Sequence, residues 1–179
     1  MVNVLTNLNH RSNLKFVGIG FDISREGIKI ASAGNSDNIW LIADLAHSPF
    51  KNNQFDIIVN ILSPANYSEF RRILKKEGLL IKVLPNPGYL MEIRKLFYSG
   101  KEKNEYSNKK TFDLLIKNFN SAHQERVIYK KEVKPDSLIP LLEMTPLCWN
   151  INKEKLNKNK WSEIREVTID LELISAKNY

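Results

Sequence analysis

The sequence has few residues of the kinds that hold metals or form disulfides. Cys148 is its single cysteine, and the histidines, His10, His47 and His123, lie far apart without the spacing of a metal-ligand set. We therefore expect no intrachain disulfide, no cysteine-based zinc site and no other metal site in this chain.

Long apolar segments are lacking as well. No stretch approaches the roughly 18 apolar residues of a membrane-spanning helix, and the N-terminal residues do not show a basic region followed by an apolar core. The sequence therefore predicts neither a membrane span nor a secretory signal. A cytoplasmic location is the resulting expectation.

Acidic residues are outnumbered: 27 lysines and arginines face 20 aspartates and glutamates, which gives a formal net charge of +7. A basic chain favours polyanionic partners such as RNA, through neutralisation of phosphates. An AT-rich genome, which encodes lysine, asparagine and isoleucine freely, is the alternative explanation. The basic residues form three groups: Arg71, Arg72, Lys75 and Lys76; Lys101, Lys103, Lys109 and Lys110; Lys153, Lys155, Lys158 and Lys160.

Short apolar segments alternate with helical patterns in the first half of the chain. Strands are predicted over 16–21, 39–43, 55–61 and 79–84, and helices over 2–8, 24–33, 67–76 and 89–98. This order predicts an α/β fold with a parallel sheet and right-handed crossovers. Because the strands show no polar alternation, we expect them to be buried on both faces.

The second half is less regular. A polar loop is expected over 99–110, helices over 112–119 and 135–144, and a strand over 126–133. Near the C-terminus, apolar residues from Val167 to Leu173 alternate strictly with polar ones. This period of two predicts a half-exposed antiparallel edge strand. With 42% hydrophobic residues and no linker, residues 1–179 are expected to form one domain.

The segment KFVGIGFDISR organises the chain, because its apolar run ends on Asp22. A carboxylate at the carboxyl end of a parallel strand lies where open α/β sheets bind ligands. There it can accept hydrogen bonds from both hydroxyls of a ribose. Alternatively, Asp22 caps the helix that begins near Ser24. Gly18 and Gly20 lie inside the strand, and we interpret them as packing positions.

Several segments carry a more specific resemblance. They read FDIS, ADLAHSPF, FDIIVNILSP, LKKEGLLIKVLPNPGYLMEIRKLFY and LLEMTPLCW. Together they resemble the bacterial 23S rRNA (guanine-N1)-methyltransferase family. The resemblance implies a Rossmann-like class I methyltransferase sheet, mostly parallel with an antiparallel C-terminal strand, S-adenosyl-L-methionine as the cofactor and 23S rRNA as the partner.

The resemblance also implies roles for residues at the cofactor. Asp22 matches the acidic residue that holds the ribose, and Ile23 would lie beside the adenine. Asp44 would accept a hydrogen bond from the adenine amino group, and Leu45 would pack on the ring. Asn60 follows at the end of a strand where cofactor and target base meet.

Other implied positions concern the base and the bound methyl donor. Pro64 lies in the turn beside the target base, and Tyr89 stands where the family has a histidine that contacts the cofactor. Met144 and Trp149 would form walls of the guanine pocket, and core packing is the alternative for both. No catalytic base is assigned; Asp44 and Glu92 are the carboxylates nearest the expected crevice, and both have structural explanations.

Two features of the family are not found in this sequence: a zinc ribbon and a first strand that ends in a glycine-rich loop. The chain resembles the C-terminal two-thirds of the enzyme. In the family sheet, the missing first strand lies between the strand ending at Asp22 and the strand containing Ile57. Two strand edges would then be open. We expect an isolated chain of low stability, or one that forms a homodimer or pairs with a missing N-terminal half.

The function predicted from the resemblance is methylation of guanine N1 in 23S rRNA, by this chain or by an enzyme of which it is the C-terminal portion. The alternative is a non-catalytic remnant or interaction module that cannot bind the cofactor alone. An NAD-dependent oxidoreductase is less consistent with the sequence, because the PNPGYLMEI segment is not typical of one.

Overall fold

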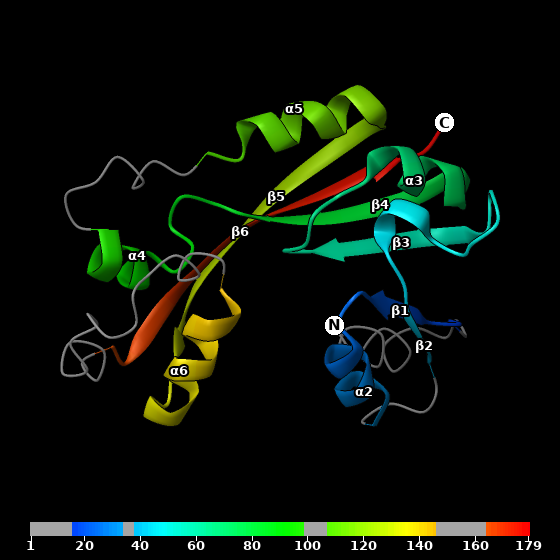
Figure 1. Ribbon diagram of the computed structural model, residues 1–179. Coiled ribbons are helices and arrows are strands. Elements are labelled where there is room, and N and C mark those ends of the chain that lie inside the picture. Colours follow the sequence, from blue (N-terminus) through cyan, green and yellow to red (C-terminus); the bar gives the residue numbers. More distant parts are fainter. Residues whose placement is uncertain (1–15, 34–37, 99–106, 146–163) are drawn as a thin grey trace. The chain divides into compact units, whose positions relative to one another are not determined.

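The computed structural model describes residues 16–33, 38–98, 107–145 and 164–179 (Figure 1). The chain divides into two compact units, Met1–Leu80 with Lys177–Tyr179, and Ile81–Ala176. The helix predicted over 2–8 and most of the loop predicted over 99–110 lie outside the described residues.

In the first unit, strands β1 (Ile19–Asp22) and β2 (Ile39–Ile42) pair in parallel, with helix α2 (Arg25–Ala33) between them in sequence. Gly20 of β1 lies under the ring of Trp40 in β2. A Cβ at Gly20 would be 2.2 Å from Trp40 Cζ3, so no larger residue fits there. The interpretation of Gly20 as a packing position is confirmed.

A second sheet has the strand order β3-β4-β6-β5. Its members are β3 (Phe55–Ile61), β4 (Leu74–Pro85), β6 (Glu166–Lys177) and β5 (Asn120–Glu132). β3 and β4 are parallel and joined by α3 (Tyr67–Ile73), whereas β6 runs antiparallel to β4 (Figure 1). The fold is therefore an α/β fold with a mixed sheet, and the antiparallel C-terminal strand is confirmed.

The C-terminal strand differs from its prediction in two ways. β6 is an interior strand between β4 and β5, and β5 is the edge strand. In addition, the polar Thr168 and Asp170 are buried, with 7% and 0% exposure, whereas Leu171 and Leu173 are only partly buried. The prediction of an exposed polar face was wrong because these polar residues bind the segment after β4, as described below.

The prediction that the early strands are buried on both faces was also wrong. Ile39 and Ile42 of β2 are 50% and 56% exposed, and Ile57 of β3 is 42% exposed. Among the described elements, α2 is the helix that packs on β1 and β2. One covering helix protects a single face, which explains why apolar side chains on these short strands remain exposed.

The helix predicted over 67–76 is shorter than expected, because β4 begins at Leu74. The side-chain amide of Asn178 donates hydrogen bonds to the carbonyl oxygens of Arg71, Leu74 and Lys75 at 3.1, 3.2 and 3.3 Å. These bonds come from a residue far away in sequence, and they satisfy carbonyl groups at the end of α3. The chain can therefore leave the helix early and enter the strand.

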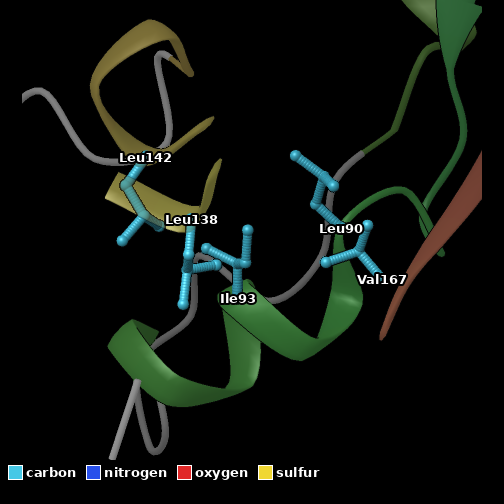
Figure 2. Packing of buried hydrophobic residues seen from close by; sticks show 5 residues of the cluster. All are labelled: Leu90, Ile93, Leu138, Leu142 and Val167. Atoms are coloured by element: carbon cyan, nitrogen blue, oxygen red, sulfur yellow. The ribbon is translucent and has the colours of Figure 1, made fainter. Parts of the chain in front are cut away.

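Each unit has its own apolar core. In the first, the ring of Phe50 contacts those of Phe21 and Phe55, with centroids 5.5 and 4.8 Å apart. In the second, α4 (Met91–Tyr98) and α6 (Pro135–Met144) contribute to a cluster with β6 (Figure 2). Its buried members are Leu90, Ile93, Leu138, Leu142 and Val167. Helix α5 (Lys109–Asn118) precedes β5 and buries Leu115.

Candidate functional site

Asp22 lies at the carboxyl end of β1 and is exposed. Its Oδ1 accepts a hydrogen bond from the backbone nitrogen of Ser24 at 2.8 Å. The cap of α2 is Ser24 itself, whose Oγ accepts from Gly27 N at 3.1 Å. Ser24, and not Asp22, is therefore the helix cap, and no hydrogen bond to Asp22 Oδ2 is found among the described residues.

A second exposed carboxylate, Asp44, follows the neighbouring strand β2. Its Oδ1 accepts a hydrogen bond from Ala46 N at 2.8 Å, and it caps the short 3₁₀ helix η1 (Leu45–His47). Asp22 pairs with Ile42, and its carbonyl accepts from Ala43 N at 3.1 Å. The structure thus brings two aspartates to the carboxyl ends of adjacent parallel strands, each held by the same kind of local turn.

The residues that follow these aspartates are apolar. Ile23 is 73% exposed, which is unusual for an isoleucine, and Leu45 is partly buried. Ile23 therefore presents apolar surface beside the exposed carboxylate of Asp22.

The loop after β3 contacts the loop after β2. Asn60 is buried, and its Nδ2 donates to Pro64 O at 3.1 Å, which closes the turn between them. Asn66 caps α3 through Oδ1, which accepts from Glu69 N at 3.2 Å, and its Nδ2 donates to Leu45 O at 3.4 Å. Asn66 was not predicted as a site residue; an asparagine before a helical pattern was the available signal.

Glu69 strengthens the contact between α3 and the loop after β2. Its carboxylate accepts hydrogen bonds from Ser48 Oγ, and from Arg72 Nε at 2.8 Å and Nη2 at 2.7 Å. The hydrogen bonds from the Arg72 guanidinium lower the pKa of Glu69 to about 2. The loop that carries Asp44 is therefore tied to α3 by an ionised glutamate, which sequence reasoning did not identify.

The second unit contains Tyr89, in a turn closed by a hydrogen bond from its nitrogen to Asn86 O at 3.0 Å. Tyr89 is partly buried, and this burial, followed by a smaller effect of Tyr129, raises its pKa.

The remaining predicted residues are placed as follows. Met144 ends α6 and is 73% exposed, so the core-packing alternative for Met144 was wrong: the last turn of the helix carries it away from the apolar cluster. Trp149 lies outside the described residues.

Glu92 has both carboxylate oxygens engaged. They accept hydrogen bonds from Thr168 N at 2.9 Å and from Thr168 Oγ1 at 2.6 Å. Burial raises the pKa of Glu92, but the bonds from Thr168 outweigh burial and lower it overall. This carboxylate is therefore built into the structure as an anchor of β6, which does not suit a proton acceptor.

The described residues contain no group of three or more histidine, cysteine, aspartate or glutamate side chains that could hold a metal ion. No helix in this part of the chain is long and apolar enough to cross a membrane.

Comparison with known proteins relates the sequence of this chain to a family. Residues 5–82 match the family described as "Methyltransferase domain". The "Putative 23S rRNA (guanine-N(1)-)-methyltransferase YxjB" of Bacillus subtilis is 36% identical over 158 residues, which cover 88% of this chain and 56% of that protein. The "23S rRNA (guanine(748)-N(1))-methyltransferase" of Streptomyces fradiae is 23% identical over 86% of this chain and 56% of its own length. The chain thus spans about half the length of these curated relatives.

Solved structures agree on the fold. The YcgJ protein of Bacillus subtilis superposes with a TM-score of 0.54 at 16% identity, covering 89% of this chain and 81% of that one. This likeness shows the fold alone; the family match over residues 5–82 and the Bacillus subtilis relative YxjB carry the class, a class I S-adenosylmethionine methyltransferase domain. Within that class it is homologous to the 23S rRNA guanine-N1 methyltransferases, and the resemblance read from its sequence is confirmed.

Proposed function

We propose that the chain binds the adenosine half of S-adenosyl-L-methionine, within an enzyme that methylates guanine N1 in 23S rRNA. The observation that carries the proposal is the pair of exposed aspartates, Asp22 and Asp44, at the carboxyl ends of the parallel strands β1 and β2. Ligands of open α/β sheets bind at this edge. The homology to rRNA guanine-N1 methyltransferases supports the choice of cofactor and substrate.

The residues present fit an adenosine group. Asp22 Oδ2 accepts from the ribose hydroxyls, while Oδ1 remains bound to Ser24 N and fixes the carboxylate. Asp44 would accept from the adenine amino group, Ile23 would lie beside the adenine, and Leu45 would pack on the ring. An ionised carboxylate is suited to both contacts, because it only accepts hydrogen bonds.

The bound cofactor supplies an electrophilic methyl group, so the protein mainly has to orient the target base and exclude water. The family resemblance assigns Asn60 and Pro64 to the target base, Tyr89 to the cofactor, and Met144 and Trp149 to the walls of the guanine pocket. The exposure of Met144 is compatible with a role at a pocket that opens toward RNA. Guanine N1 must lose its proton, and Glu92 is not proposed as the acceptor because Thr168 occupies both of its oxygens.

Binding to rRNA is supported by the net charge of +7 and by the names of the homologues. Part of the first basic group is already ion-paired, since Arg72 binds Glu69 and Lys75 binds Asp56 at 2.8 Å. Cations without such internal pairing contribute more to phosphate binding, because no internal pair must be broken.

The methionine half of the cofactor requires close approach to the backbone, which glycine-rich loops provide. Within the described residues, Gly20 does not serve this purpose, because the Trp40 ring fills the space above it. We propose that a glycine-rich segment outside the described residues completes this part of the site, and that another copy or the N-terminal half of a homologous enzyme can supply it. The open edges of β1 and β3 in the described sheets are its natural attachment points.

Calorimetric titration with S-adenosyl-L-methionine tests the proposal. Asp22→Ala should weaken binding about 30-fold or more, because hydrogen bonds to a charged acceptor are lost. Asp56→Ala is the matched control: Asp56 is an exposed carboxylate near the amino end of β3, and its loss should leave affinity unchanged. Equal affinity of the Asp22→Ala variant and the unaltered chain would remove Asp22 from the site. No binding by the unaltered chain, alone or with an N-terminal half, would favour the non-catalytic interaction module.

A further inference from the structure

The connection between β2 and β3, residues 43–54, lies along one side of helix α3 within the first unit. Three polar residues, Asn66 at the cap of α3 and Glu69 and Arg72 within it, follow one another at intervals of three positions. Residues at this spacing lie on the same side of a helix. Each of the three binds the connection at a different point.

These contacts follow the same order along the helix and along the connection. They are Asn66 Nδ2 to Leu45 O at 3.4 Å, Ser48 Oγ to Glu69 Oε1, and Arg72 Nη1 to Asn52 Oδ1 at 2.8 Å. Two backbone bonds complete the far end, from Asn53 N to Arg72 O at 2.9 Å and from Gln54 N to Ile73 O at 2.7 Å. The connection is thus held to α3 from η1 to the start of β3.

Helix η1, which follows Asp44, is held at both of its ends. Glu69 binds Ser48, directly after the last residue of η1, and Asn66 binds the carbonyl group of its first residue. At the start of the turn, Asp44 Oδ1 accepts from Ala46 N at 2.8 Å. The turn cannot rotate without breaking one of these bonds, so the contacts to α3 determine the direction of the Asp44 carboxylate.

Glu69 is suited to this task because its own orientation is fixed. Arg72 donates to both of its carboxylate oxygens, from Nε at 2.8 Å and from Nη2 at 2.7 Å. This pairing keeps Glu69 ionised, and hydrogen bonds to an ionised acceptor are the stronger ones. Glu69 is 9% exposed, so its bond to Ser48 is largely shielded from water.

A second link joins the connection to the strand of the other aspartate. Phe50 is buried, and its ring contacts that of Phe21 with centroids 5.5 Å apart. Because Phe21 directly precedes Asp22, this contact sets the position of the connection relative to Asp22.

We propose that Glu69 is a positioning residue of the adenosine site: through Ser48 it fixes η1 and so directs the Asp44 carboxylate toward the amino group of the adenine. The proposal rests on the proposed function, which assigns the adenine to Asp44. It adds that selection of adenosine over other nucleosides depends on a residue that does not touch the ligand. The exposed pair of Lys75 and Asp56, by contrast, joins β4 to β3 outside this network.

The test compares adenosine with purine riboside, which lacks the amino group, by calorimetric titration of the full chain. The unaltered chain should bind adenosine about tenfold more tightly, because one hydrogen bond to a charged acceptor distinguishes the two. In Ser48→Ala this preference should fall to about threefold or less, since a misdirected hydrogen bond weakens steeply, while the affinity for purine riboside stays unchanged. Ser48→Thr keeps the hydroxyl and should restore the preference. Asp56→Asn is the matched control and should leave both affinities unchanged.

Glu69→Gln shows whether Glu69 acts through Ser48. It should lower the preference as Ser48→Ala does, and combining the two changes should add little. Equal loss of affinity for both nucleosides in Ser48→Ala would indicate a general structural role and overturn the proposal. An unchanged preference, or effects of the two substitutions that add in full, would also overturn it. If Glu69→Gln does not fold, Ser48→Ala and Ser48→Thr decide.

A measurement without ligand separates this proposal from the proposed function. In Ser48→Ala, the backbone amide of Ala46, which binds Asp44 Oδ1, should shift in the NMR spectrum and exchange its hydrogen faster. An unchanged Ala46 signal would overturn the proposal even where binding is seen. If neither nucleoside binds the unaltered chain, the proposed function is contradicted and the role of Glu69 toward adenine falls with it, while the Ala46 signal still decides whether Glu69 holds η1.

Discussion

At the scale of single residues, the chain uses carboxylates in two distinct ways. Asp22 and Asp44 are exposed, and each is held by one short local hydrogen bond. Glu69 and Asp170 are buried, and arginines pair with them. We propose that Asp22 and Asp44 accept hydrogen bonds from a ligand. The carboxylates of Glu69 and Asp170 instead bind arginines within the fold.

Glu69 leads to a prediction about acid stability. Its pKa is about 2 in the folded chain, against an ordinary value of 4.5. Between these values the unfolded chain binds the proton more readily, so the stabilisation from Glu69 is present above about pH 4.5 and is lost as the pH falls toward 2. Thermal unfolding followed by circular dichroism should show this loss. Glu69→Gln should flatten the dependence in that window, and an identical pH profile for both chains would contradict the assignment.

At the scale of elements, contacts between distant segments decide where strands begin and end. β4 starts five residues earlier than predicted, and β5 starts six residues earlier, because both pair with β6 along its length. Asn178, just beyond β6, satisfies the carbonyl groups that α3 leaves free.

Asn178→Ala should therefore destabilise the junction between α3 and β4. The variant leaves buried carbonyl oxygens without their donor, which typically costs about 1–3 kcal/mol. Urea denaturation measures the change. Lys177→Ala is the control: Lys177 pairs with Glu77 at 3.6 Å between exposed side chains, and its removal should change stability by less than about 1 kcal/mol. Equal stability of the two variants would show that the Asn178 bonds do not hold the junction.

At the scale of the molecule, the described strands form two sheets rather than one. β1 pairs only with β2, and β3 is the end strand of the four-stranded sheet in the described part of the chain. The resemblance read from the sequence implies a further strand between the corresponding positions of the family sheet. We therefore expect the chain to gain stability and cofactor affinity from a polypeptide that supplies such a strand.

This expectation is tested by adding the part of the Bacillus subtilis homologue that lies outside its aligned region. Light scattering should detect a one-to-one complex, and the affinity for S-adenosyl-L-methionine should rise about tenfold or more, because the added segment completes the site. An unrelated polypeptide of the same length is the control. A stable monomer that melts cooperatively, does not bind the segment and has unchanged cofactor affinity would contradict the model of a shared site.

The sequence alone determined the order of strands and helices, the antiparallel C-terminal strand and the placement of Asp22 and Asp44 at strand ends. These features follow from local patterns: apolar runs, turn residues and the position of a polar residue where a run stops. The packing role of Gly20 also followed, because a glycine inside a strand marks a close approach.

Only the tertiary structure decided which face of β6 is buried, where β4 begins and which carboxylates are exposed to solvent. Alternation along Val167–Leu173 shows two faces but does not say which one meets a neighbour, and here the segment around Gly88 covers the polar face. Likewise, the sequence alone does not show that Asp170 is buried and Asp22 is exposed. Their difference arises because Arg126, some 40 residues away in sequence, reaches one of them, and such long-range pairings leave no trace in local periodicity.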